Sequence, residues 1–163
     1  MSQSLKERLA AKQRRTVTVP VQISDPGPAR DELERTQKQA TLWETIATKD
    51  DEDSQERLAA AREERARAAA VFNEHFVEVE FASGSPDDVE RILEAHSDDD
   101  GWTLASLPEL AALCAVEEEL RDPEWWAEQL APDGSWSSGE RGGLWQELMR
   151  INTQMPPERL PKG

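Results

Sequence analysis

The stretch FVEVEFASGSPDDVERILEAH, from Phe76 to His96, decides how the rest of the chain is interpreted, because its hydrophobic period changes partway along. Apolar residues alternate with glutamates from Val77 to Phe81, and a period of two is typical of a half-buried strand. Gly84 then ends the alternation. The sequence therefore predicts a strand over 76–81 followed by a turn.

A short helix is predicted directly after that turn. Ser85 suits the N-cap and Pro86 the first helical position, because a serine oxygen can accept from a free backbone N–H and proline has no N–H to leave unpaired. Aspartates follow in the first turn, where their charge favours the positive end of a helix. The apolar side of this helix, expected over 87–96, consists of Val89, Ile92 and Leu93.

A second alternating stretch lies near the N-terminus, over 16–23, after a short predicted helix over 4–14. The apolar face of this strand consists of Val17, Val19, Val21 and Ile23. Pro20 has no N–H to donate, so the strand is expected at a sheet edge. The composition of residues 24–28 predicts a turn after it.

Helix-forming composition fills the chain between the two strands, over 29–49 and 55–73, with the acidic loop 50–53 between. Two long helices joined by so short a loop predict an antiparallel helical hairpin. The expected inner residues are Leu33, Ala40, Trp43 and Ala47 on the first helix and Leu58, Ala61, Arg65, Ala69 and Phe72 on the second. Packing within the chain and packing against another copy both remain open, since they use the same pattern. The hairpin returns the chain to its start, so we expect the two strands to be neighbours, covered by helix 87–96.

Short helices are predicted for the remainder of the chain. Pro108 and Pro123 suit first turns, Asp122 suits a cap, and the last helix is expected from Ser138 to Asn152 without a capping box. The predicted fold class is α+β and mostly helical, with a small two-stranded sheet, an inserted long helical hairpin and a C-terminal cluster of short helices. The expected segments are an N-terminal helix or arm over 1–15, a strand–hairpin–strand unit over 16–82, a helical domain over 83–155 and a flexible tail over 156–163.

Composition narrows the classes of function. The 163 residues carry a formal net charge of -15, with a sequence pI near 4.5, so the chain should repel nucleic acid and anionic membranes. No apolar run approaches the roughly 20 residues that span a bilayer, and the basic N-terminus lacks the apolar stretch of a signal peptide. We therefore expect a cytoplasmic protein. The single cysteine, Cys114, is expected to be a small buried hydrophobe.

No motif for catalysis, metal or cofactor is present in the sequence. The run Asp98–Asp100 lacks the later glutamate of a calcium loop, and His75 and His96 lack partners at zinc-ligand spacing. His96 is expected instead to interact with the carbonyl end of its helix. There is neither a glycine-rich phosphate loop with its lysine nor a nucleophile elbow. We expect no enzyme, no catalytic residue, no metal and no cofactor.

The order and character of the segments resemble a known family over about residues 14–155. FVEVEFASGSP and DDVERILEAH are followed by SLPELAALCAVEE, DPEWWAEQL, WSSGERGGLW and LWQELMRIN, which ends on Asn152 as the family's last helix does. The N-terminal strand TVTVPVQISDPGPARDELER and the charged hairpin also fit. The chain resembles the tail assembly chaperones of long-tailed bacteriophages, in the siphovirus-type form common among phages of actinobacteria. It departs from them at His96-Ser97-Asp98, where family members often have His-Pro-Pro.

The resemblance implies a non-catalytic protein of viral tail assembly, made in the cytoplasm of the infected host bacterium and absent from the mature virion. Its implied partners are the tape measure protein, which it would bind and solubilise, and the tail tube protein, whose subunits it would help to recruit. Self-association is a further open possibility, while nucleic acid and membrane are not expected partners. Two alternatives stay open: a structural tail or head–tail component retained in the virion, and an acidic decoy that inhibits a host nucleic-acid-binding protein.

An apolar groove on an acidic exterior would suit such a chaperone, because a long helical apolar partner aggregates when it is unprotected. We hypothesise that partner-binding residues lie along this groove or in the core beside it, two roles that the sequence does not separate. They are Leu107, Leu110, Leu113, Trp125, Trp126, Leu144, Trp145 and Leu148.

Overall fold

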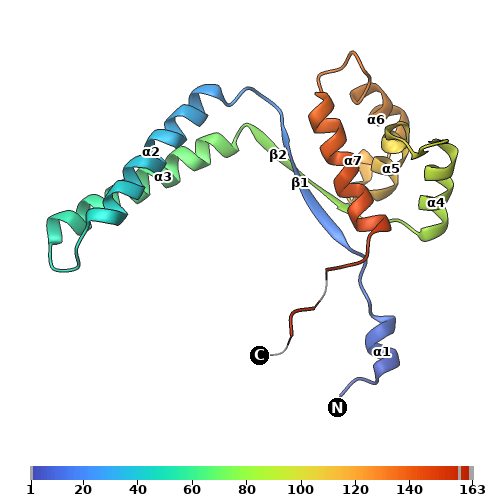
Figure 1. Cartoon of the computed structure of the whole chain (residues 1–163), viewed down its shortest axis with the longest axis horizontal. Coiled ribbons are helices and arrows are strands. Elements are labelled where there is room, and N and C mark those ends of the chain that lie inside the picture. Colours follow the sequence, from blue (N-terminus) through green and yellow to red (C-terminus); the bar gives the residue numbers. More distant parts are fainter. Residues whose placement is uncertain (1, 158, 162–163) are drawn as a thin grey trace. The chain divides into compact units, whose positions relative to one another are not determined.

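The computed structural model describes residues 2–157 and 159–161 (Figure 1). The fold is α+β and mostly helical, as predicted, with a small two-stranded antiparallel sheet. The chain divides into two compact units, one formed by residues 1–19 and 79–163 and the other by residues 20–78. The sequence analysis placed both strands with the hairpin, whereas each strand passes from one unit into the other at its middle. Part of the expected tail over 156–163 lies outside the described residues.

Strands β1 (Thr16–Gln22) and β2 (Phe76–Ala82) are hydrogen-bonded neighbours, which confirms the predicted pairing. The N–H of Ile23 donates to the carbonyl of His75 at 2.8 Å, and the N–H of Ser83 donates to the carbonyl of Arg15 at 2.8 Å. These two bonds frame the register, in which odd-numbered residues of β1 turn their N–H groups toward β2. Pro20 therefore stands where an N–H would point out of the sheet, so its missing donor costs no ladder bond.

The apolar face of the sheet is most deeply covered in the unit that holds the C-terminal helices, while Val21 in the other unit is half-buried. Val17, Val19 and Val79 pack against the core of the unit with the C-terminal helices, and Phe81 is fully buried in it. Ile23 was predicted on the same face, but it lies beyond the end of β1 and is 60 % exposed. An alternating pattern marks a face, but whether that face is covered depends on the elements that pack beside it.

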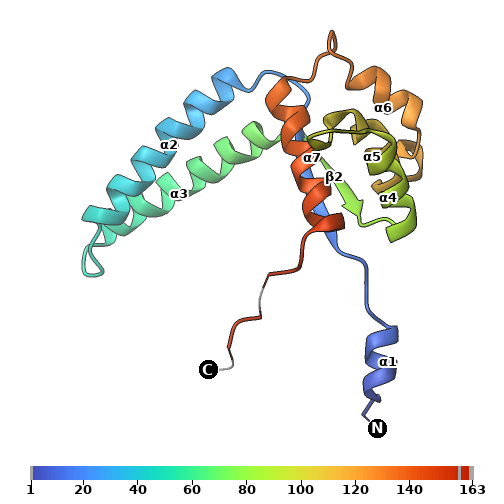
Figure 2. The same ribbon diagram turned by 45° about the vertical axis from the view of Figure 1, so that its right-hand side comes forward.

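Helices α2 (Gly27–Ile46) and α3 (Glu52–Asn73) pack against each other as the predicted hairpin (Figures 1 and 2). Asp51 caps α3 by accepting from the N–H of Asp53 at 3.2 Å. The interior of the hairpin is small, because its buried residues are Thr36 and Ala40 on α2 and Ser54, Leu58, Ala61 and Ala68 on α3. Ala68 is buried, whereas Ala69, which the sequence analysis placed on the inner side, is half-buried.

Charged pairs cross the hairpin beside this thin interior. Glu44 of α2 accepts from Arg62 and Arg65 of α3, both at 3.4 Å, and the Arg57 guanidinium lies 5.4 Å from the ring centre of Trp43. Each of these arginines is more than a third exposed, so each ion pair contributes little to stability. The hairpin is therefore held by small-residue packing along its length, with charges on its flanks.

The other unit begins with α1 (Leu5–Ala10) and continues after β2 with α4 (Pro86–Ala95), capped by Ser85 as predicted. Next come the two-residue strands β3 (Ser97–Asp98) and β4 (Gly101–Trp102), which pair antiparallel, where the sequence predicted only a polar break. Gly101 adopts φ +113°, which explains a glycine at the end of that turn. The remaining elements are η1 (Leu104–Ser106), α5 (Leu107–Cys114), η2 (Glu118–Leu120), α6 (Pro123–Gln129) and α7 (Ser138–Thr153).

The N-cap of α7 corrects the sequence analysis. The cap is Ser137, whose side chain accepts from the N–H of Glu140 at 3.1 Å, while Glu140 accepts from the N–H of Ser137 at 3.1 Å. This is a capping box, which the analysis missed because it assigned the cap to the next serine.

Helices α4, α5, α6 and α7 enclose one apolar core with the paired strands. Leu110 and Leu148 are fully buried at its centre, and Trp126 is 2 % exposed. Among the described residues, no helix combines the length and apolar character needed to cross a membrane.

Candidate partner-binding surface

Five of the eight residues proposed from the sequence as partner contacts lie inside the core: Leu107, Leu110, Trp126, Leu144 and Leu148, each at most 2 % exposed. Trp126 is held by the carbonyl of Leu120, to which its indole N–H donates at 2.7 Å. Side chains this deeply enclosed have no free area for a partner in this conformation. They hold the fold together, which is the second of the two roles that the sequence left open.

The other three residues are partly accessible and lie at the edge of the same core. Trp125 is 39 % exposed and packs edge-on against Trp126, with ring centres 5.0 Å apart. The indole of Trp145 donates to the Ser106 hydroxyl at 3.0 Å. Leu113 packs against the core near Gly84. Because five of the eight are enclosed in the core, the eight residues do not form one open groove.

The polar residues singled out from the sequence have structural partners. His96 stands at the C-terminal end of α4 as expected, where its backbone N–H bonds the Leu93 carbonyl at 3.3 Å, and its ring bonds Glu109 of α5 at 2.8 Å. His75 bonds the Ser24 hydroxyl at 2.6 Å. Among the described residues, no group of three or more His, Cys, Asp or Glu could hold a metal ion, and Asp98 accepts from the N–H of Asp100 within its own turn.

Cys114 is buried at the end of α5, and burial raises the pKa of its thiol above the ordinary range. Hydrogen bonds from Asn152 and Gly84 oppose this shift without cancelling it. Because the thiolate is the reactive form of cysteine, a buried thiol with a raised pKa is poorly suited to act as a nucleophile.

The side chain of Asn152, half-buried at the end of α7, joins three segments of the core. Its oxygen accepts from the N–H of Gly84 at 2.9 Å, and its nitrogen donates to the carbonyl of Leu148 at 2.7 Å and to the Cys114 sulfur at 3.4 Å. It therefore links α7 to the turn after β2 and to the end of α5. These three bonds are structural contacts.

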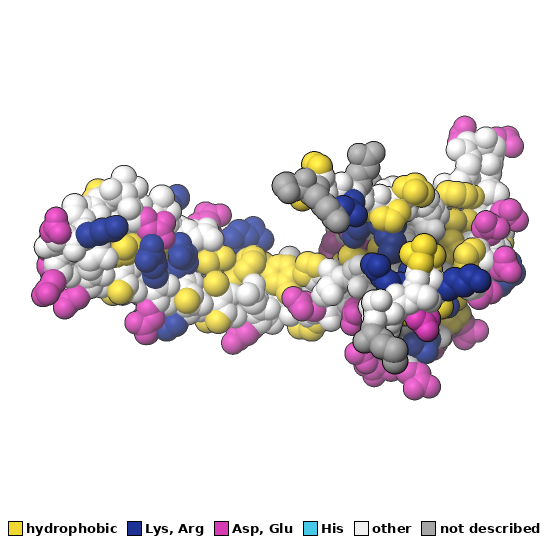
Figure 3. Space-filling model, turned by 90° about the horizontal axis from the view of Figure 1, so that it is seen from below, with side chains coloured by type: hydrophobic (Ala, Val, Ile, Leu, Met, Phe, Trp, Pro, Cys, Tyr) yellow, Lys and Arg dark blue, Asp and Glu magenta, His cyan; other side chains and the backbone are white. Residues whose placement is uncertain are grey.

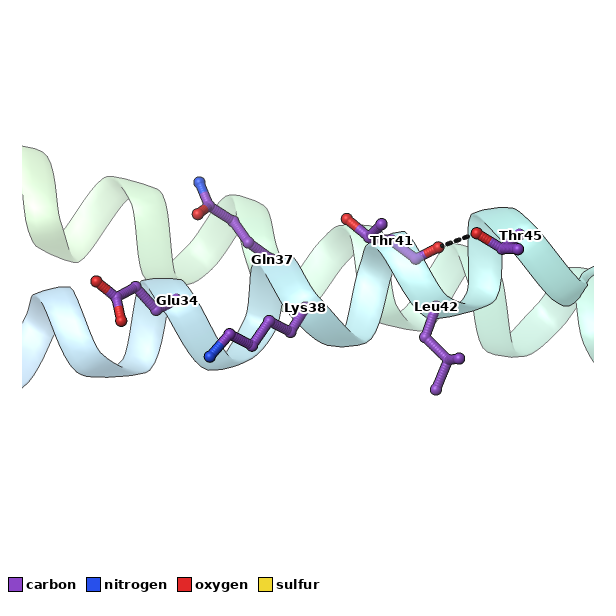
Figure 4. A pocket seen from close by; sticks show the side chains of 6 residues that line it. All are labelled: Glu34, Gln37, Lys38, Thr41, Leu42 and Thr45. Atoms are coloured by element: carbon purple, nitrogen blue, oxygen red, sulfur yellow. Dashed lines mark hydrogen bonds between the residues drawn. The ribbon is translucent and has the colours of Figure 1, made fainter.

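An accessible apolar surface lies on the hairpin instead. Leu42 and Ile46 of α2 are 53 % and 50 % exposed, and their i, i+4 spacing places them on one side of the helix. Leu42 lines a surface groove with Glu34, Gln37, Lys38, Thr41 and Thr45 (Figure 4). Thr45 donates to the carbonyl of Thr41 at 2.9 Å, so its hydroxyl is satisfied within the helix. We call Leu42 and Ile46, with this groove, the α2 surface.

A second apolar surface lies at the end of the hairpin that adjoins the strands, where hydrophobic side chains gather in Figure 3. Phe72 and Phe76 pack with ring centres 5.2 Å apart and line a groove with Pro20, Asn73 and Glu78. Along the rest of the hairpin, acidic, basic and apolar side chains are interspersed (Figure 3). The hairpin thus offers apolar surfaces on a charged helical frame.

Sequence reasoning missed the α2 surface, although a signal for it was present. Leu42 and Ile46 stand one position away from the inner stripe of α2, on the same side as each other. Two apolar residues at i, i+4 outside an inner stripe favour a second contact face.

Comparison of this chain with protein-family models, with curated proteins and with solved structures returns no match.

Proposed function

We propose that the chain is a non-catalytic assembly chaperone of a phage tail, which binds the tape measure protein along its helical hairpin and keeps it soluble. The α2 surface carries this proposal. Leu42 and Ile46 are bulky apolar side chains half open to solvent, on a 20-residue helix that buries only Thr36 and Ala40. Most of that helix is therefore free to lie along another helix.

The chemistry of the hairpin suits a long helical partner. A helix of 20 residues is about 30 Å long, so one hairpin could follow some five turns of a partner helix. Apolar residues at i, i+4 are the usual anchors when helices pair in a groove. The net charge of -15 would keep a complex with an apolar partner in solution.

The same proposal includes recruitment of tail tube subunits, action in the host cytoplasm and release before the virion is complete. These parts rest on the family resemblance of the segments. Mass spectrometry of purified particles tests the release, because a chain retained at fixed copy number would favour a structural tail component instead.

Co-expression with a phage tape measure protein tests the binding. We expect a soluble complex with the wild-type chain, and aggregated tape measure protein without it. The double variant Leu42→Ser/Ile46→Ser should lose the complex while its unfolding midpoint stays at the wild-type value, because both side chains are half-exposed already.

The matched control is Val71→Ser, which changes an equally exposed apolar residue on α3. Retained binding of the tape measure protein by this control would assign recognition to the α2 surface. Equal loss of binding in both variants would indicate non-specific hydrophobic binding by the hairpin. Trp125→Ala tests the remaining accessible residue of the sequence-derived set. Loss of binding there alone, at unchanged stability, would move the site to the C-terminal helices.

A further inference from the structure

Helix α1 is an amphipathic helix without a covered face. Its N-terminus is fixed by a capping box, in which Ser4 accepts from the N–H of Glu7 at 3.2 Å and Glu7 accepts from the N–H of Ser4 at 2.6 Å. None of its residues is buried, and Leu5 and Leu9 are 69 % and 64 % exposed at i, i+4 spacing. An isolated helix of six residues is marginal in water, so α1 needs a surface against which to pack.

The charge of this arm is opposite to that of the helices that follow the sheet. Residues 2–15 contain five Lys and Arg against one Glu, a net charge of +4. Residues 79–155 contain four Lys and Arg against 18 Asp and Glu, a net charge of -14. A basic arm with two exposed leucines, Leu5 and Leu9, is therefore complementary to an acidic surface that also has exposed apolar area.

The segment of η2 and α6 offers such a surface. Its one cation, Arg121, is turned onto the backbone, where its guanidinium donates to the carbonyls of Ala115 at 3.0 Å and Val116 at 3.1 Å. Among the described residues, the six carboxylates over 117–129 form no salt bridge: Glu117, Glu118, Glu119, Asp122, which caps α6, Glu124 and Glu128. Trp125 and Val116, 39 % and 38 % exposed, supply apolar area beside them.

In this structure the arm does not cover that surface on its own chain, because none of the residues of α1 is buried. Arg15 is fixed at the C-terminal end of α7, because its guanidinium donates to the carbonyls of Arg150 at 2.9 Å and Gln154 at 2.6 Å. Arg14 donates to the carbonyl of Ser83 at 3.2 Å, so residues 11–13 connect this anchored point to α1. Helix α6 lies toward the opposite end of α7 in both views of the ribbon, and the 16 residues of α7 span about 24 Å (Figures 1 and 2).

We propose that α1 docks on the η2–α6 surface of a second copy of this chain, through Leu5 and Leu9 and the cations around them. One six-residue helix covers too little area for a stable complex, whereas reciprocal exchange in a two-fold dimer doubles that area. The affinity should therefore lie in the micromolar range. This self-association goes beyond the proposed chaperone function and involves neither the hairpin nor a tape measure protein.

Analytical ultracentrifugation of the purified full chain tests the proposal. We expect concentration-dependent dimers at 50 mM NaCl that weaken on the order of tenfold at 500 mM, because the contact is partly electrostatic. Leu5→Ser/Leu9→Ser should weaken dimerisation on the order of 100-fold, as expected for exposing two leucines. The matched control, Leu42→Ser/Ile46→Ser on the hairpin, should dimerise like the wild type. A monomeric wild type, or dimers that survive the loss of both arm leucines, would overturn the proposal.

A charge exchange gives the sharper test. Lys6→Glu/Arg8→Glu/Lys12→Glu makes the arm acidic, and Glu118→Lys/Glu119→Lys/Glu124→Lys makes the docking surface basic. Each variant alone should be monomeric, and an equimolar mixture should form heterodimers, because each arm then meets a surface of opposite charge. Failure of the mixture to associate, with both variants folded by circular dichroism, would rule out this pairing. Binding of the wild-type arm to anionic phospholipid vesicles without dimers in solution would instead assign it to membranes.

Discussion

Replacing Asn152 by alanine should destabilise the unit that contains the C-terminal helices by about 2 kcal/mol. The substitution removes the bond to the Gly84 N–H at 2.9 Å and the bond to the Leu148 carbonyl at 2.7 Å. Each such bond contributes about 1 kcal/mol net. The Gly84 N–H is only half-buried, so water can partly replace its lost partner and the cost stays at the lower end of the range.

Urea titration followed by tryptophan fluorescence measures this change in the correct part of the molecule. Five of the six tryptophans belong to the unit with the C-terminal helices, and only Trp43 lies in the hairpin. With a denaturant slope of about 2 kcal/mol per molar urea, the midpoint should fall by about 1 M. A separate hairpin transition would be followed by circular dichroism.

The control lies one residue further along the helix. Thr153 is exposed, and its hydroxyl donates only to the carbonyl of Met149 within α7, at 2.7 Å. Thr153→Ala should therefore change stability by less than about 0.5 kcal/mol. Equal midpoints for Asn152→Ala and Thr153→Ala would refute the role of Asn152 as a link between α7, the turn after β2 and α5.

Three further predictions concern the same core. Gly84→Ala places a methyl group 2.7 Å from the Leu113 side chain and should cost about 1–2 kcal/mol in urea titration, whereas Gly142→Ala, in α7 with nothing within 4 Å, should be neutral or stabilising. Leu110→Ala, at a fully buried site, should cost about 3–4 kcal/mol and clearly more than Leu113→Ala at the edge of the core; similar losses would contradict the burial pattern. Burial raises the pKa of the Cys114 thiol, so its contribution to stability is complete below the unfolded pKa of about 8.5 and declines as the pH rises further. Unfolding titrations between pH 7.5 and 10 should show a smaller decline for Cys114→Ala, and identical slopes would exclude this linkage.

Local signals in the sequence predicted local structure well. The Ser85 cap, the proline after it and the two alternating strands depend on residues close together in the chain, and the structure confirms each of them. The capping box at Ser137 has an equally local signal, because a glutamate follows the serine three residues later. The sequence analysis missed it because it assigned the cap to the adjacent Ser138.

Burial of the candidate site could not be predicted, because it depends on segments far apart in the chain. A helical period identifies the apolar side of α6, yet only the tertiary fold shows that Trp126 lies inside and Trp125 at the surface. Two hydrogen-bond partners of Asn152, Cys114 and Gly84, lie 38 and 68 residues away in the chain, so no local sequence pattern predicts these bonds. Conversely, Leu42 and Ile46 are exposed because α3 covers only the other side of α2.

The hairpin leaves and rejoins the sheet at a single point, where the N–H of Ile23 meets the carbonyl of His75 at 2.8 Å and the Ser24 hydroxyl meets the His75 ring at 2.6 Å. Between these residues, α2 and α3 pack chiefly against each other. The hairpin can therefore change in length without a change in the sheet. Seven residues added to each helix would lengthen the hairpin by about 10 Å while keeping its inner and outer sides in phase. Natural variation and protein engineering can therefore change the reach of the hairpin, or replace it, while the strands that carry it keep their register.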